Sequence, residues 1–167
     1  MEAVSRLFPA ALSDVAAGLN GLQRLRFGER PARALVERLR ELAPGAFPGA
    51  NLGSDSLPWR MVRGGLLYAA DAFEEAHAIF QEIDSAEGSY WHGMLHRREG
   101  DFGNAEYWVR RAGTVEALEK LRGFDPVAFV RACARADSSA HDPEDLLGWQ
   151  RREWEALLGS AWSKLAQ

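Results

Sequence analysis

Two histidines and a glutamate are spaced so that one helix would present all three on a single face. His92, His96 and Glu99 stand at positions i, i+4 and i+7, which places them within roughly 60° of one another around a helix axis. Imidazole nitrogens and carboxylate oxygens are common ligands of zinc and other divalent ions. One interpretation of this spacing is therefore a metal site formed by His92, His96 and Glu99, with Ser89 beside it and a coordination position left for water.

Two other interpretations of these histidines stay open. Burying an unpaired polar group costs about 1–3 kcal/mol, so histidines packed between helices need partners. They can be structural residues that bind Glu99, Tyr107 or the C-terminal helix. They can also border a pocket in which arginines hold a small anion. The candidate ligand-binding residues are Arg63, His92, His96, Arg97, Glu99, Tyr107 and Arg111.

Arginines follow in two adjacent pairs, Arg97–Arg98 and Arg110–Arg111, on consecutive predicted helices. Neighbouring helical residues point about 100° apart, so at most one member of each pair faces a given pocket. We therefore expect these arginines mainly on a solvated face, with glutamates as partners. From the last predicted helix, Gln150 and Glu153 could reach the His92 site across the fold.

The elements that must position these residues are predicted to be helices. Apolar residues have helical spacing along almost the whole chain, and no convincing run of alternating β-branched residues is present. We predict a single all-α domain over 1–167, with an N-terminal hairpin (1–43), a loop (44–57), two repeat-like hairpins (58–113) and C-terminal helices (114–167). Individual helices are expected near 4–19, 31–42, 58–70, 72–84, 88–99 and 102–112, followed by a hairpin at 115–136 and a last helix from about 143 to 165.

The middle of the chain repeats itself at an offset of 29 residues. Gly64, Leu66, Phe73 and Ala76 align without a gap over Gly93, Leu95, Phe102 and Ala105. Small residues at these places would let the two helices of each unit approach closely. The predicted architecture is a compact array of antiparallel helical hairpins, a tetratricopeptide-like α-α superhelix in which the last helix caps the stack or joins two copies.

The segment GMLHRREGDFGNAEYWVRRAG, residues 93–113, resembles a tetratricopeptide or Sel1-like repeat. The copy at 64–84 matches less well, and neither copy has the closing proline of such repeats. More broadly, YWHGMLHRREGDFGNAEYWVRRAG together with FDPVAFV and QRREWEALL is similar to a family of bacterial and fungal all-helical proteins. This resemblance implies a shared fold and a shared site, and it implies no reaction.

Composition limits the classes of function. The chain has 167 residues, 47% of them hydrophobic, and 20 basic against 24 acidic side chains give a net charge of -4. This balance argues against a nucleic-acid partner, and no apolar run is long enough to span a membrane. Cys133 is the one cysteine; it is predicted to be a buried structural thiol, and its isolation favours the cytoplasm.

Two functions remain after these exclusions. The favoured one is a noncatalytic helical-repeat interaction or scaffold protein that binds a protein or peptide, can form homo-oligomers and has a polar pocket around His92 and His96. The alternative is a small-molecule or anion-binding protein, or a metal-dependent hydrolase, that uses His92, His96 and Glu99 with zinc or another divalent ion.

Overall fold

The computed structural model describes residues 13–28, 31, 33–47 and 49–165, and this part of the chain is helical without a strand. Its α-helices are α2 (Ser13–Gly18), α3 (Arg33–Glu41), α4 (Leu57–Ala69), α5 (Phe73–Phe80), α6 (Ala86–Glu99), α7 (Phe102–Ala112), α8 (Glu116–Glu119), α9 (Pro126–Ala136) and α10 (Glu144–Leu165). Two short 3₁₀ turns are η2 (Gly21–Gln23) and η3 (Pro44–Ala46). The predicted all-α class is confirmed.

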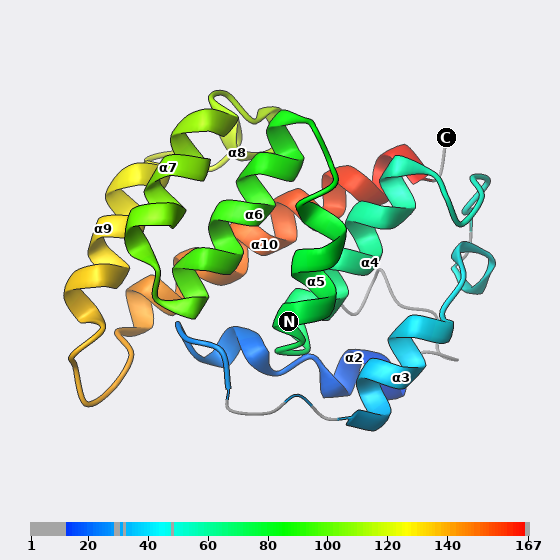
Figure 1. Ribbon diagram of the computed structural model, residues 1–167, viewed down its shortest axis with the longest axis horizontal. Helices are drawn as coiled ribbons and strands as arrows, with labels where there is room; N and C mark the ends of the chain where they lie inside the picture. Colours follow the sequence, from blue (N-terminus) through cyan, green and yellow to red (C-terminus); the bar gives the residue numbers. More distant parts are fainter. Residues whose placement is uncertain (1–12, 29–30, 32, 48, 166–167) are drawn as a thin grey trace.

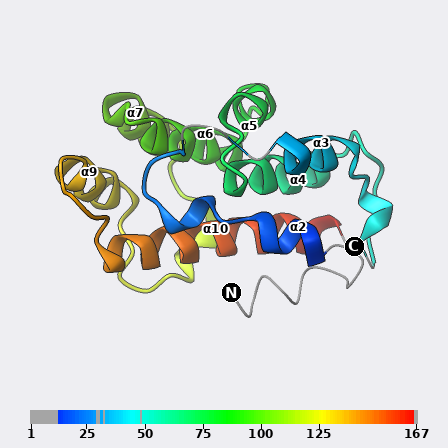
Figure 2. The same cartoon turned by 90° about the horizontal axis from the view of Figure 1, so that it is seen from below.

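The helices lie in two layers. Figure 2 shows α10 running along one side together with α2, while α3 to α7 lie on the other side. Consecutive helices pack closely, α4 on α5 and α6 on α7, and α9 lies beside α7 (Figure 1). The long helix α10 packs mainly on α4 and also contacts α8, α9 and η2. Most apolar residues of α10 are therefore buried against the chain itself.

Most predicted helices occur close to their expected positions. The four central helices match α4 to α7, and the last one matches α10. The predicted helix at 4–19 falls mainly outside the described residues, within which α2 covers its final part. Among its described residues, the predicted loop 44–57 contains η3 and the first residue of α4, Leu57. The 115–136 region forms the short α8 and the longer α9.

Short polar side chains set the ends of α6 and its neighbours. Ser85 Oγ accepts the Gly88 N–H at 3.0 Å at the start of α6. Gly100, at φ 94°, ends α6 in the left-handed conformation that glycine adopts most readily. Asp101 then caps α7 through the Asn104 N–H at 3.1 Å. The helix that carries His92 and His96, α6, is thus joined to α7 by a turn of two residues.

Two further aspartates precede helices and bind different partners. Asp125 caps α9, because its Oδ1 accepts the Val127 and Ala128 N–H groups at 2.9 and 3.0 Å. Asp142 stands just before α10. Its Oδ2 accepts the N–H of Leu25 at 2.9 Å, so this carboxylate ties the start of α10 to the N-terminal segment.

Two aligned glycines lie where helices approach closely. A Cβ added to Gly64 would stand 2.5 Å from Phe80 Cζ, and one added to Gly93 would stand 2.9 Å from Val109 Cγ2. Both distances are shorter than van der Waals contact allows, so the small residue is required at each place. The expected role of these glycines in bringing α4 onto α5 and α6 onto α7 is confirmed.

The prediction that Arg97 and Arg98 lie on a solvated face is wrong. The two residues are 1% and 0% exposed. Arg97 binds Glu153 of α10 through two hydrogen bonds of 2.9 and 2.6 Å, and its guanidinium lies 4.4 Å from the centre of the Phe129 ring. Glu153 also accepts the Tyr90 hydroxyl at 2.6 Å. A bidentate ion pair closed to water therefore joins α6 to α10.

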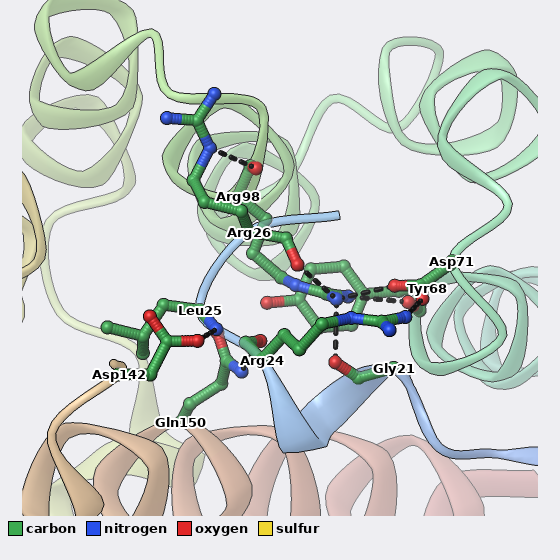
Figure 3. A network of polar contacts seen from close by, with 9 residues as sticks. All are labelled: Gly21, Arg24, Leu25, Arg26, Tyr68, Asp71, Arg98, Asp142 and Gln150. Carbon is green, nitrogen blue, oxygen red and sulfur yellow. Dashed lines mark hydrogen bonds and ion pairs between the residues drawn. The ribbon is translucent and has the colours of Figure 1, made fainter. Parts of the chain in front are cut away.

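Arg98 binds oxygens from two separate parts of the chain (Figure 3). Its guanidinium donates to the backbone oxygens of Tyr68 at 2.9 Å, Gly21 at 2.7 Å and Arg26 at 3.2 Å, and to Asp71 Oδ1 at 2.5 Å. These acceptors come from the end of α4 and from the segment around η2. Arg98 therefore holds the N-terminal segment against the central helices.

Arg24 reinforces this contact at its edge. It pairs with the second oxygen of Asp71 at 2.5 Å, so one carboxylate serves two arginines. Asp71 itself has a φ of 61°, which is uncommon for a residue with a side chain. Its conformation is held by the two ion pairs and by the short turn between α4 and α5.

We predict that replacing one member of the Arg97–Glu153 pair destabilises the protein more than replacing both. Glu153→Leu leaves the Arg97 charge buried without a partner, so the free energy of unfolding should fall by about 3–5 kcal/mol in urea denaturation. Arg97→Met with Glu153→Leu removes both charges and should be more stable than Glu153→Leu alone. A double variant as unstable as the single one contradicts this account.

Glu155 provides the control. It lies on the same helix, is half-buried, and has no ion pair within the part of the chain that the structure describes. Glu155→Leu should change the free energy of unfolding by about 0.5 kcal/mol or less.

Candidate functional site

The structure brings a third histidine to the predicted pair. One ring nitrogen from each of His77, His92 and His96 lies within 4.8 Å of the other two. His92 and His96 come from α6, one turn apart, and His77 comes from the neighbouring α5. His92 Nε2 and His77 Nε2 are 2.9 Å apart, a hydrogen bond in which one ring donates and the other accepts. We call these three residues the histidine cluster.

Glu99 has a different place from the one predicted. Its Oε2 lies 2.9 Å from His96 Nδ1, so it binds the side of the ring that faces away from a ligand at Nε2. A carboxylate in this position fixes the orientation and tautomer of a histidine and makes its other nitrogen a better ligand. The ring nitrogens that converge are therefore those of His77, His92 and His96, and Glu99 binds one of these rings.

Aromatic rings hold the cluster on two sides. The Phe73 ring centre lies 5.3 Å from that of His77, and the Trp108 ring centre lies 4.3 Å from that of His92. His92 and His96 are 7% and 8% exposed, while His77 is half-buried. The cluster is thus shielded from most solvent yet open near His77.

Burial and neighbouring histidines lower the pKa of two members of the cluster, His92 and His77. Burial, followed by the neighbouring His77 and His96, lowers the pKa of His92 from 6.5 to about 4. Burial and His96 also lower the pKa of His77, against the opposing effect of Glu99 and Glu74. Neutral imidazoles have a free lone pair, which is the form that binds metal ions.

A cavity of about 240 Å³ borders the cluster at His92. We call it the His92 cavity. Ser89, Trp108 and Arg111 contribute to its wall, together with residues at the end of α5 and in the turn to α6. Of the residues predicted to bind a ligand, His92 and Arg111 line this cavity, and Ser89 lies beside them as the spacing indicated.

The other predicted residues lie elsewhere. Arg63 lines a separate cavity of about 510 Å³ between α3, α4 and α5. Arg97 is buried against Glu153. Tyr107 is 56% exposed, and the ring contact it makes is with Trp108. The structure therefore separates Arg63, Arg97 and Tyr107 from the histidine cluster.

Two residues of the last helix were expected to reach the His92 site. They bind α6 and the N-terminal segment instead. Glu153 binds Arg97 and Tyr90, and Gln150 donates to the Arg24 backbone oxygen at 2.7 Å. Neither contacts the histidine cluster. Cys133 is 3% exposed, as predicted, and burial raises the pKa of its thiol to about 11.

His77 is the member of the cluster that the sequence analysis missed. It lies in FEEAHAIF, where no second histidine or cysteine gives a metal-binding spacing. The available signal was indirect: the predicted repeat places helix 72–84 directly before helix 88–99, so the two had to be neighbours. A histidine on the first helix was then a candidate partner for the pair on the second.

Comparisons of the chain with protein-family models, curated proteins and solved structures gave no match. The resemblance to tetratricopeptide or Sel1-like repeats stays a prediction. None of the helices among the described residues combines the length and apolar character that crossing a membrane requires.

The lowered pKa of His92 predicts how the stability of the metal-free protein depends on pH. Between the usual value of 6.5 and the folded value of about 4, the unfolded chain binds more protons at this residue than the folded chain does. The free energy of unfolding should therefore be fully retained above pH 6.5 and decrease as the pH falls toward 4. Urea denaturation in the presence of a chelator measures it.

His92→Gln removes this titrating group, so its stability should depend less on pH in the same window. The exposed His141 has no contact with the cluster, and His141→Gln should keep the wild-type dependence. Identical pH profiles for the wild type and His92→Gln would show that His92 is not protonated more easily in the unfolded chain.

Proposed function

We propose that this protein binds one divalent transition-metal ion of the zinc class through His77, His92 and His96. The observation that carries the proposal is the convergence of one nitrogen from each ring within 4.8 Å. Three histidines from two helices are a ligand set that suits zinc, and such a set leaves one position of a tetrahedral ion free.

The spacing of the His77 and His92 nitrogens needs only a small adjustment. Zinc binds imidazole at about 2.0–2.1 Å, so two ligating nitrogens of a tetrahedral site stand about 3.3 Å apart. His77 Nε2 and His92 Nε2 are 2.9 Å apart. A slight separation of the rings, with a change of tautomer in the one that donates, would exchange this hydrogen bond for two metal bonds. His77 is half-buried and has room for such a change.

Glu99 supports this interpretation. Histidine ligands commonly donate their second nitrogen to a carboxylate, which raises the basicity of the ligating nitrogen. The 2.9 Å contact of Glu99 with His96 Nδ1 has this form. A bound ion of this class would act as a Lewis acid and could activate a water at its free position. The alternative of a metal-dependent hydrolase is therefore retained, with His77 in place of Glu99 as the third metal ligand.

We also retain the scaffold function, with the proposed metal site inside the scaffold. We propose that α4 to α7 form two tetratricopeptide-like helical pairs, with α10 as a capping helix. Supporting this are the contacts of α4 with α5 and of α6 with α7, the close approaches at Gly64 and Gly93, and the packing of α10 over α4. The metal site lies between the pairs, because His77 belongs to the first and His92 and His96 to the second.

The proposal predicts one tightly bound ion per chain. Protein freed of metal by a chelator and titrated with zinc should bind one equivalent, measured by calorimetry and elemental analysis. His77→Ala, His92→Ala and His96→Ala should each weaken the affinity by about 100-fold or more, and Glu99→Gln by about 10–100-fold. Far-UV circular dichroism should show that each variant remains helical.

His141 provides the control for this test. It is the fourth histidine of the chain, is exposed and lies outside the cluster. His141→Ala should bind zinc as the wild type does. Binding below one equivalent in the wild type, or equal loss in His141→Ala, would exclude the three-histidine site.

A further inference from the structure

We infer that the site takes a small oxyanion, a carboxylate or phosphate group, which lies in the His92 cavity, completes the coordination of the metal and pairs with Arg111. This inference rests on the proposed metal site and deepens it by naming the class of ligand. The carrying observation is that an arginine with spare hydrogen-bonding capacity lines the same cavity as a cluster histidine.

Arg111 differs from the arginine beside it in how it is paired. Its guanidinium lies 4.0 Å from Asp84, and the Asp84 side chain is fully exposed. Arg110, by contrast, donates to Glu106 at 3.0 and 2.7 Å. At 4.0 Å no hydrogen bond forms, and Arg111 donates none to any other group in the described part of the chain, so its planar donors can bind an oxyanion in a bidentate manner.

The orientation of Arg111 is set by Trp108, whose ring also packs against the cluster. Its guanidinium carbon lies 5.5 Å from the centre of the Trp108 ring, and the Trp108 ring lies 4.3 Å from that of His92. An arginine held over an aromatic ring has fewer conformations to lose on binding. The same tryptophan therefore supports both the ligand histidine and the arginine.

Ser89 supplies a second polar group. It is 8% exposed and lines the cavity. Among the described residues, its hydroxyl has no hydrogen-bond partner, while its backbone N–H is bound within the helix start. A hydroxyl and a guanidinium on one cavity wall match the several acceptor oxygens of a carboxylate or phosphate.

Charge and size favour a small anion. Three neutral imidazoles leave the charge of a divalent ion uncompensated by its ligands, and Glu99 on His96 offsets only one unit. Of the carboxylates at the cavity rim, Glu82 is paired with Arg60 at 3.2 Å and Asp84 points into solvent. About 240 Å³ is less than the roughly 300–1,000 Å³ of pockets for drug-sized ligands. The cavity therefore fits an oxyanion group rather than a large organic molecule.

Cobalt provides a direct test, because its visible spectrum reports the ligands around it. Wild-type protein loaded with one equivalent of Co(II) is titrated with acetate and, separately, with inorganic phosphate. Saturable changes in the cobalt absorption bands are expected with at least one of these anions. Arg111→Gln should weaken that anion affinity about tenfold, corresponding to the loss of a charged hydrogen bond, and leave the cobalt affinity within about twofold.

Arg110→Gln is the matched control, since it removes the same charge one residue away, at a side chain paired with Glu106. It should leave both affinities unchanged. Cobalt binding without any spectral response to the anions, or equal anion affinities of Arg111→Gln and the wild type, overturns the inference and leaves the metal site standing. Failure of the wild type to bind cobalt overturns the metal site, and this inference falls with it.

Discussion

Two adjacent arginines sealed from water set the constraint that the rest of the structure must meet. Arg97 and Arg98 are consecutive residues near the end of α6, and neither can keep its charge in the interior without compensation. Glu153 of α10 pairs with Arg97, and Asp71 with three backbone oxygens binds Arg98. Because consecutive residues point to different sides of a helix, α6 is held both to α10 and to the N-terminal segment and the end of α4.

The need to pair both arginines determines the position of α6 more than it raises the free energy of unfolding of the protein. A buried ion pair contributes little free energy relative to apolar residues of similar size, but an arrangement that leaves one partner alone is heavily penalised. Rotation of α6 about its axis would unpair both guanidinium groups at once. His92 and His96 lie within the preceding two turns of the same helix, so the ion pairs also fix the direction in which these imidazoles point.

The sequence specifies what is local and leaves open what depends on partners far along the chain. Helical spacing, the caps at Asp101 and Asp125 and the small residues Gly64 and Gly93 act within a few residues or between neighbouring helices, so the helices could be predicted. The burial of Arg97 could not, because its partner Glu153 lies 56 residues away and arginines are normally exposed. The role of His77 could not be predicted for a similar reason, because it reaches the cluster only through the packing of α5 on α6.

In the proposed metal site, helix geometry favours a third ligand from another helix. With a rise of about 1.5 Å per residue, His96 lies about 6 Å along the axis from His92, a span that two imidazoles can bridge to one ion. Glu99 lies about 10.5 Å from His92, which is too far for three side chains to meet at bonds of about 2 Å. His77 approaches from the side, across the contact of α5 with α6. An ion bound there would therefore cross-link α5 and α6, and Glu99 is left free to orient His96.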